Sequence, residues 1–518
     1  MTWISLLLAC GLGDGTVGVK PGETDIVADT TPDAADTDAP DETLPVFPDV
    51  CMPQIAVEPH ALEGREIVAT VSCETGADPL AVGLTWIAPG FTVDGLTARW
   101  TPGLADAGLH DVLVSVPHGS GLPETGVATI SVADDWQHPE NVRVDPATYT
   151  EEWGIPVLSL LPDADIGFED VPMTAWWDGV AYTGDIHIRG AASASYPKNN
   201  YTLEFEPTQL KIVDSSDKDH LVLISNFDDN SHMRQKLVFD SWAEMATFAG
   251  EDRLTPRSFF VVVYIEGTYS GLYVAVDHVD DEFISEMGLD QTGNLYKSVS
   301  HDANFYLKDS LSAGWEKKEG ADLGDFSDLD ALTAWAGSVS DAQFAAEVGS
   351  WLPVDEFADW FLLVHHTASD DSAGKNAYLY NQPTAGTWWR YAPWDFNHSY
   401  GQAWTTARVA PDSYNLFQWN NAIFKHIQQE PALATQMWDR YRALREPGQA
   451  LAVDRQLAQI DAMAALIDDS ARRDWSRWEA DYRSYWGWRN DILDYDGEKA
   501  YLEQWVIDRD VFLQVADP

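Results

Sequence analysis

Positive charge is scarce in this sequence. Its 518 residues include 31 Lys and Arg against 84 Asp and Glu, so the formal net charge is −53 at pH 7. Such a chain repels the phosphates of nucleic acids and the headgroups of anionic lipids. We therefore expect no nucleic-acid partner, and a bound nucleotide would need local positive charge or a metal ion.

Long apolar runs and cysteines are also scarce. No stretch of the sequence reaches the length of about 18 apolar residues that marks a membrane-spanning helix. Cys10 ends a short apolar run that resembles a bacterial lipoprotein signal, although residues 1–8 are few and carry no basic residue. We predict a signal over residues 1–10, export to the cell envelope (outer membrane or surface), and a lipid anchor on Cys10 that holds the chain to a membrane.

The region that follows changes character near residue 50. Residues 11–50 carry an acidic run at 33–42 and no apolar periodicity, which predicts a disordered acidic linker. Residues 51–135 alternate between apolar and polar positions in short runs divided by turn residues, which predicts an all-β, Ig-like sandwich serving as a spacer or adhesion module. Cys51 and Cys73 are a candidate disulfide in an oxidising compartment.

From residue 140 to 518 the pattern predicts an α+β domain with a helical C-terminal cap. Short alternating runs predict strands at 185–189, 201–205 and 220–224, and a hairpin across Glu266-Gly267. Apolar spacing predicts helices at about 231–248, 328–349, 354–369 and 414–446, and further helix from 450 to 510.

One predicted hairpin carries the strongest chemical signal. Its strands are expected at 376–380 and 387–392, so Asp371 and Asn376 lie at its mouth and Asp395 lies where its second strand ends. Three oxygen ligands from the two ends of one hairpin can converge on a hard cation such as Mg²⁺. The spacing also follows the logic of a protein-kinase centre, in which one Asp orients the acceptor hydroxyl and an Asn and a second Asp hold metal. Spacing of this kind is weak when it stands alone.

Further motifs occur in a fixed order around that hairpin. They are Arg189–Ser193, Pro197–Tyr201, Ser225–Arg234, Tyr269–Tyr273, Gly293–Lys297, Asp371–Asn376, and Pro393–Asp395 with Gly401. Together they resemble the CotH family of spore-coat protein H kinases, over about 300 residues. The resemblance implies an atypical protein-kinase-like fold that binds ATP with Mg²⁺ (or Mn²⁺) and phosphorylates Ser or Thr on surface or exported proteins.

The resemblance also implies roles for individual residues. Asp371 matches the catalytic Asp, and Asn376 and Asp395 match the metal-binding positions. Lys198 is the first choice for the lysine that contacts phosphate, and Lys297 is its rival. Two further residues, Arg189 and Asn226, are expected to bind the nucleotide.

Two departures from the family pattern leave other functions open. Asp277 stands where the family usually has Glu, and Asn397 replaces the second Asp of the metal turn. A lysine partner of Asp277 is therefore expected to be strained or bridged by water. The alternative function is a non-catalytic cell-surface or adhesion protein on a degenerate kinase-like scaffold. A metal-dependent hydrolase that uses the same acidic cluster is a more distant alternative.

Overall fold

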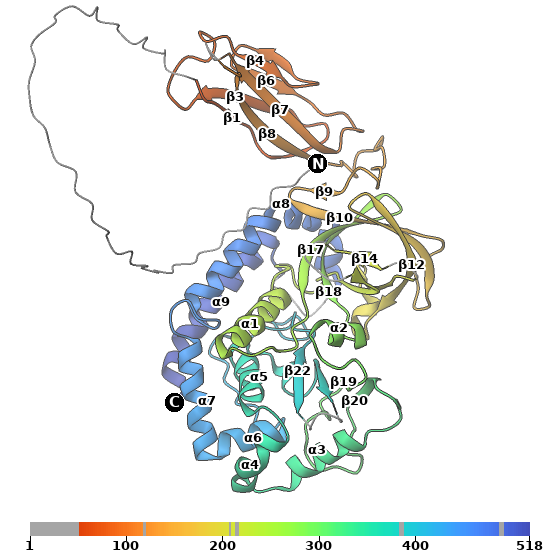
Figure 1. Ribbon diagram of the computed structural model, residues 1–518, viewed down its shortest axis with the longest axis vertical. Coiled ribbons are helices and arrows are strands. Elements are labelled where there is room, and N and C mark those ends of the chain that lie inside the picture. Colours follow the sequence, from red (N-terminus) through yellow and green to blue (C-terminus); the bar gives the residue numbers. More distant parts are fainter. Residues whose placement is uncertain (1–50, 118–120, 207–208, 213–216, 383–387, 486–491) are drawn as a thin grey trace, which may run out of the picture. The chain divides into compact units, whose positions relative to one another are not determined.

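The computed structural model describes residues 51–117, 121–206, 209–212, 217–382, 388–485 and 492–518. The predicted signal with Cys10 and the predicted linker over 11–50 lie outside these residues. Within them the chain is multi-domain, with a strand-rich N-terminal region and a helical C-terminal part (Figure 1), and the sequence pattern predicted both. No helix in the described part of the chain combines the length and the apolar character that crossing a membrane requires.

Residues 53–133 form two four-stranded sheets. Along β3 every second side chain from Ile67 to Cys73 is buried and those between are exposed, as the alternation in the sequence predicts. A disulfide joins Cys51 to Cys73. The sheet orders are β1-β3-β6-β5 and β2-β8-β7-β4, with strands at β1 Pro53–Ala56, β2 His60–Leu62, β3 Ile67–Cys73, β4 Thr85–Ile87, β5 Thr92–Asp94, β6 Thr97–Trp100, β7 Gly108–Val116 and β8 Glu124–Ala133.

The next part of the chain builds an eight-stranded sheet, seven strands of which close into a ring. The order is β11-β12-β13-β16-β18-β17-β10-β9, and β10 pairs back onto β11. Leu203, Leu223 and Tyr273 belong to one buried cluster, while Val222 and Val274 on the opposite face belong to the cluster that includes helix α1. The elements are β9 Glu151–Glu152, β10 Ile155–Pro162, β11 Val171–Trp177, β12 Val180–Arg189, η1 Ala192–Ser195, β13 Asn200–Glu204, β16 His220–Ile224, α1 Arg234–Ala249, β17 Ser258–Ile265 and β18 Thr268–Asp277, with the separate pair β14 Leu210–Lys211 and β15 Asp217–Lys218.

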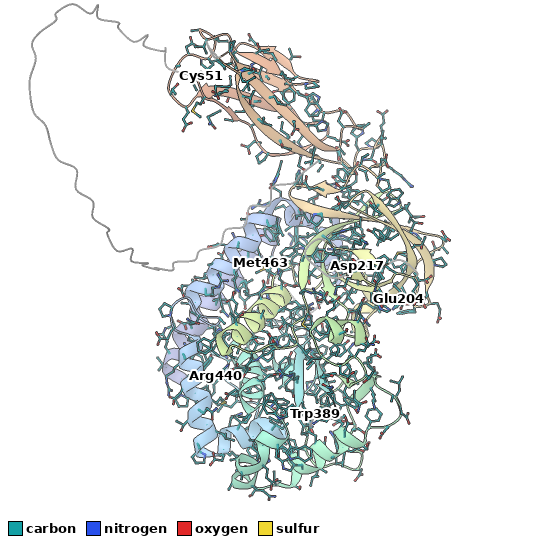
Figure 2. All side chains as sticks on the ribbon, in the orientation of Figure 1. Cys51, Glu204, Asp217, Trp389, Arg440 and Met463 are labelled. Carbon is teal, nitrogen blue, oxygen red and sulfur yellow. A yellow bond between two sulfur atoms is a disulfide. The ribbon has the colours of Figure 1, made fainter. Side chains whose placement is uncertain are left out.

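A second sheet, in the order β20-β19-β21-β22, carries the hairpin singled out above. Helix α5 packs on this sheet through Trp360, whose ring stacks on Tyr391 with centroids 4.8 Å apart. Side chains fill the space between the sheet and its helices, and Trp389 at the start of β22 is fully buried (Figure 2). The elements are α2 Asp281–Glu286, β19 Asn294–Ser298, β20 Trp315–Glu319, α3 Ser327–Ser338, α4 Asp341–Glu347, η2 Val348–Ser350, α5 Val354–Thr367, η3 Asp370–Ala373, β21 Ala377–Asn381 and β22 Trp389–Pro393.

Two of the predicted helices are broken by capping residues. The helix expected at 328–349 divides into α3 and α4, because the Ser340 side chain accepts a hydrogen bond from the Gln343 backbone and starts a new helix. The helix expected at 414–446 begins only at Ala422, where Asn421 is the N-cap, and restarts at Pro431 after Glu430 caps the next helix. These two helices are α6 Ala422–Gln429 and α7 Pro431–Leu444.

The C-terminal helices α8 Val453–Tyr485 and α9 Tyr495–Ala516 run alongside each other (Figure 1). They pack on the α+β region through buried residues such as Leu502 and Trp505, in agreement with the predicted cap. Arg509 of α9 is almost fully buried and donates hydrogen bonds to the carbonyl oxygens of His365 and His366, at the end of α5. The last helix therefore fixes the segment that leads into Asp371.

Candidate active site

The hairpin brings the three predicted carboxylate and amide residues together. Ala377 lies opposite Pro393 in the antiparallel pair, so Asn376 and Asp395 emerge at the same end of the two strands. The Asn376 amide nitrogen lies 3.1 Å from Asp371 Oδ2 and 3.3 Å from the backbone oxygen of Asp395. Asp371, Asn376 and Asp395 thus converge at one end of the hairpin, as the sequence pattern predicts.

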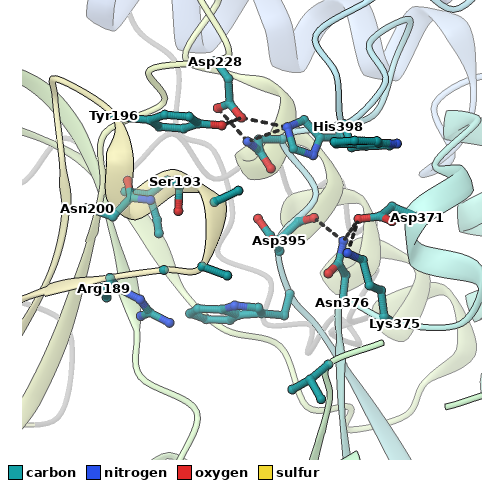
Figure 3. Close-up of a pocket in the computed structure, with 18 of the residues that line it drawn as sticks. Arg189, Ser193, Tyr196, Asn200, Asp228, Asp371, Lys375, Asn376, Asp395 and His398 are labelled. Atoms are coloured by element: carbon teal, nitrogen blue, oxygen red, sulfur yellow. Dashed lines mark hydrogen bonds and ion pairs between the residues drawn. The ribbon is translucent and has the colours of Figure 1, made fainter. Parts of the chain in front are cut away.

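These residues line a cavity of about 300 Å³, and its other side is lined by Arg189, Ser193 and Asn200, at the end of β12, in η1 and at the start of β13 (Figure 3). Every predicted site residue of the α+β domain except Lys198 borders this cavity. Residues without a predicted role border it too, among them Tyr196, Asp228, Lys375 and His398. The predicted members are Arg189, Asn226, Lys297, Asp371, Asn376 and Asp395.

Three of the lining residues have an unusual backbone. Asn226, Asn376 and Asp395 have φ values of 50°, 60° and 59°, in the left-handed region that residues other than glycine rarely adopt. Asn and Asp tolerate this region better than other side chains, but each instance still costs on the order of 1 kcal/mol. Strain of this kind is characteristic of residues held in place for a function.

Two cations form one wall of the cavity. The guanidinium carbon of Arg189 lies 5.0 Å, and the Lys297 ammonium 5.8 Å, from the centre of the Trp394 ring. Burial, together with the charge of Arg189, lowers the pKa of Lys297 to about 8, although Asp395 acts in the opposite direction. Nη1 of Arg189 is buried and has no hydrogen-bond partner among the described residues. A chain with so few basic residues therefore directs two of them at a single space that an anion can enter.

Lys198 does not line this cavity, so the geometry favours its rival Lys297 as the phosphate-contacting lysine. The side chain is fully buried, with its ammonium 2.6 Å from Asp474 Oδ1 in α8 and 2.6 Å from the carbonyl oxygen of Leu272. The ammonium also lies over the ring of Tyr273. All of its interactions serve to tie α8 to β18, so Lys297 replaces it in the site.

Asp277 also lies away from the cavity lining. Its two carboxylate oxygens lie 3.0 Å from the Lys218 ammonium and 2.8 Å from Nε of Arg257. The shorter side chain therefore pairs directly with a lysine, and the expected water bridge is not needed.

The acidic wall of the cavity contains Asp228, which is not among the predicted site residues. Asp228 accepts hydrogen bonds from the Asn397 amide at 2.8 Å and the Tyr196 hydroxyl at 3.0 Å, and its Oδ2 lies 2.7 Å from His398 Nε2. Burial raises the pKa of Asp228, but His398 and these hydrogen bonds lower it by more, so the net pKa falls below its usual value. The carboxylate is thus held ionised beside the cavity.

The neighbouring residue, Asp229, has a structural role at the start of α1. Asp229 accepts hydrogen bonds from the backbone nitrogens of Ser231 and Arg234 and pairs with the Arg234 side chain, at the start of α1. Asp229 thus stabilises the turn before α1, whereas Asp228 borders the cavity.

The donor atoms present fit a hard divalent cation. The Asp395 side chain is exposed to the cavity, and the Oδ1 atoms of Asn226 and Asn397 are buried without a hydrogen-bond partner among the described residues. Carboxylate and amide oxygens are the ligands that Mg²⁺ and related ions take in proteins. Asn397, which removes one carboxylate from the metal turn, still offers a neutral oxygen.

Asp371 connects this cavity to a second hollow of about 310 Å³. Both hollows are bordered by Asp371, His398 and Trp404, and the Trp404 side chain is 61% exposed. Asp371 Oδ1 lies 3.1 Å from His301 Nε2 and Oδ2 lies 3.0 Å from the Lys375 ammonium. The carboxylate is held in one orientation at the junction of the two spaces.

Comparison with known proteins identifies the family. Residues 186–513 match the family model described as CotH kinase protein. The chain belongs to the CotH kinase protein family. The matched residues include every residue of the cavity described above, from Arg189 to Trp404.

Similar individual proteins support the same family. The chain is 30% identical over 254 residues to the inner spore coat protein H of Bacillus subtilis (strain 168), a match that covers 48% of this chain and 66% of that CotH protein. Among solved structures, an endo-fucoidan hydrolase of glycoside hydrolase family 107 aligns over 33% of this chain and 28% of its own, at 14% identity and a TM-score of 0.12. That alignment is too poor to carry an argument.

Proposed function

We propose that this chain is a metal-dependent protein kinase that transfers the γ-phosphate of ATP to Ser or Thr of other proteins. The observation that carries the proposal is the division of one cavity into a cationic wall, with Arg189 and Lys297, and an opposite wall of carboxylates and amides, with Asp228, Asp395 and Asn376. A triphosphate with a bound metal ion needs both. Membership of the CotH kinase protein family supports the same reaction.

The roles follow from position. Arg189 and Lys297 hold the phosphates, because each offers N–H donors and charge to the cavity. Asp395, Asn376 and Asn397 would hold Mg²⁺ or Mn²⁺, which when bound neutralises the charge on the phosphates. Asp228 and His398 keep the Asn397 amide turned so that its nitrogen faces Asp228, which leaves its oxygen for the cation.

Asp371 orients the acceptor. It borders the second hollow, where a Ser or Thr hydroxyl from a protein substrate can approach along the line toward the γ-phosphorus. A new bond forms between the hydroxyl oxygen and that phosphorus, the bond to the β–γ bridging oxygen breaks, and the acceptor proton passes to Asp371. Phosphoryl transfer relies chiefly on positioning, so a fixed carboxylate is sufficient as the base.

We further propose that the kinase acts in the cell envelope. The named relative is a protein of the inner spore coat, and the lipoprotein-like residues up to Cys10 provide an anchor. Residues 51–135, with their two sheets and disulfide, are then an Ig-like spacer that holds the α+β domain away from the membrane. Substrates on the surface or in the envelope are within reach of such a tethered enzyme.

Calorimetry on the full chain tests the proposal. ATP is titrated with Mg²⁺, with Mn²⁺ and with neither, and transfer of labelled γ-phosphate to added protein is then followed. Asp395→Asn and Lys297→Met should each lose metal-dependent ATP binding. Lys318→Met is the matched control, because Lys318 does not line the cavity and pairs with Glu316 of its own strand, β20, so this variant should bind ATP normally.

Two results would point to other functions. A folded chain that binds no ATP with either metal would favour the non-catalytic surface protein, which the loss of a carboxylate at Asn397 favours. Release of free phosphate in the absence of an acceptor protein, at the rate expected for transfer, would favour a hydrolase.

A further inference from the structure

A second cluster of ligand-type side chains lies outside the cavity. His220 is the first residue of β16, His278 directly follows β18, and Asp280 is the N-cap of α2. β16 and β18 pair antiparallel with Leu221 opposite Asp277, so the start of one strand lies beside the end of the other. Residues 58 positions apart in the sequence are brought together by that register, and no kinase motif includes them.

The atoms converge on one point. Asp280 Oδ2 lies 3.3 Å from His220 Nδ1 and 2.8 Å from His278 Nδ1, and each residue has a ligand atom within 4.8 Å of the others. Ligands at about 2.0–2.1 Å from a tetrahedral zinc ion are about 3.3 Å from one another. The three side chains therefore need to move only slightly to bind one ion.

Neighbouring residues orient the three side chains, and one side of the cluster is open to solvent. Asp280 Oδ1 accepts a hydrogen bond from the Phe283 backbone at 3.0 Å, which turns Oδ2 toward the histidines. Asp219 Oδ1 lies 3.0 Å from the same His220 Nδ1, and Glu204 Oε1 lies 4.0 Å from His220 Nε2. The side chain of Asp280 is 8% exposed, while His220 and His278 are 31% and 27% exposed, so one side of the cluster faces solvent.

We propose that His220, His278 and Asp280 bind one transition-metal ion of the zinc class, with Asp219 or a water molecule as the fourth ligand. Two imidazoles and a carboxylate favour Zn²⁺ over Mg²⁺, whereas the ligands proposed for the active-site ion, Asp395, Asn376 and Asn397, offer only oxygen. The ion would join the start of β16, the end of β18 and the first turn of α2. It is a structural site, separate from the proposed nucleotide site in both position and ligand type.

The test uses the untagged full chain, stripped of metal with a chelator. Titration with Zn²⁺ alone should give one tight equivalent, and Co²⁺ should give the visible absorption of a tetrahedral site. His220→Gln and His278→Gln should each weaken Zn²⁺ binding by more than about tenfold, since replacing even an outer partner of a metal ligand costs that much. Zn²⁺ should raise the Tm of the wild-type chain and not that of these variants.

Three controls separate the explanations. His138→Gln changes a histidine that belongs to no cluster of possible metal ligands among the described residues and whose Nδ1 accepts a hydrogen bond from the Glu140 backbone at 3.1 Å, and this variant should bind Zn²⁺ normally. Asp395→Asn should lose Mg²⁺-dependent ATP binding and keep the Zn²⁺ site. Asp280→Asn keeps an N-cap oxygen and removes the ligand charge, so it tests the site if a histidine variant fails to fold. The absence of stoichiometric Zn²⁺ binding, or Zn²⁺ binding that survives in His220→Gln and His278→Gln, would overturn the proposal and leave an ion-pair cluster only.

Discussion

Replacing Lys198 by Met should lower the stability of the chain and leave its ATP affinity unchanged. Replacing Lys297 by Met should lower ATP affinity and leave stability unchanged. Lys198 is fully buried in an ion pair with Asp474, and Lys297 borders the cavity without being fully enclosed. Removing one partner of a buried pair costs about 3–5 kcal/mol, because the other charge stays buried and uncompensated. In Lys198→Met, Asp474 keeps hydrogen bonds from the Leu272 backbone at 2.8 Å and the Tyr482 hydroxyl at 2.6 Å. The loss in free energy of unfolding should therefore lie near the lower end of that range, at about 3 kcal/mol.

Lys297→Met should show the reverse pattern. Burial lowers the pKa of this lysine, which means that its charge is costly in the folded state, so replacing it should leave the free energy of unfolding unchanged or slightly higher. ATP affinity, in contrast, should drop by at least about tenfold, equivalent to about 1.4 kcal/mol for one lost charged contact. For Lys198→Met the ATP affinity of the folded fraction should equal that of the wild-type chain.

Urea unfolding and calorimetry on both variants provide the measurements. The double variant Lys198→Met, Asp474→Asn is the control, because it removes both charges and should recover part of the lost stability. A folded, stable Lys198→Met chain without ATP binding would refute the reasoning. An ATP affinity of Lys297→Met equal to that of the wild-type chain would refute the assignment of the cationic wall.

Three more outcomes can be checked. Asp371→Asn should reduce the phosphoryl-transfer rate by roughly a hundredfold or more and leave ATP affinity unchanged, as expected for a residue that acts only on the acceptor; a parallel loss of ATP binding would contradict this role. ATP affinity of the wild-type chain should fall as the pH rises through about 8, because Lys297 is protonated below its pKa of about 8 and neutral above it, and Lys297→Met should flatten this dependence between pH 7 and 9 in calorimetry. Replacing Cys51 and Cys73 by Ser should destabilise the N-terminal β region by about 3 kcal/mol, as calculated for a loop of 22 residues, and should leave ATP binding intact; equal unfolding midpoints would argue against a stabilising disulfide.

Local patterns were sufficient to predict the hairpin and the convergence of Asp371, Asn376 and Asp395 at one end of it. Asn376 and Asp395 flank two short apolar strands joined by a turn, and an antiparallel register places the two ends together whatever the rest of the fold does. The same local reasoning predicted the alternating strand β3 and the helical C-terminal part.

Local patterns could not predict which side chains reach the cavity where distant residues decide their direction. Lys198 was preferred over Lys297 because it follows a proline in a motif, but its direction is set by Asp474, which lies 276 residues later. Asp228 is likewise placed by Asn397 and His398, about 170 residues further on. The helix breaks at Ser340 and Pro431, in contrast, were visible in the sequence as a capping serine and a proline, and apolar spacing alone missed them.

The contact between Arg509 and the end of α5 has a consequence for the order in which the site can form. Arg509 holds the carbonyl oxygens of His365 and His366, and the chain continues from there to Asp371. A growing polypeptide lacks this contact until α9 has been synthesised. The residues that line the cavity, from Arg189 to Trp404, are therefore all present before the contact that holds the segment leading to Asp371 can form.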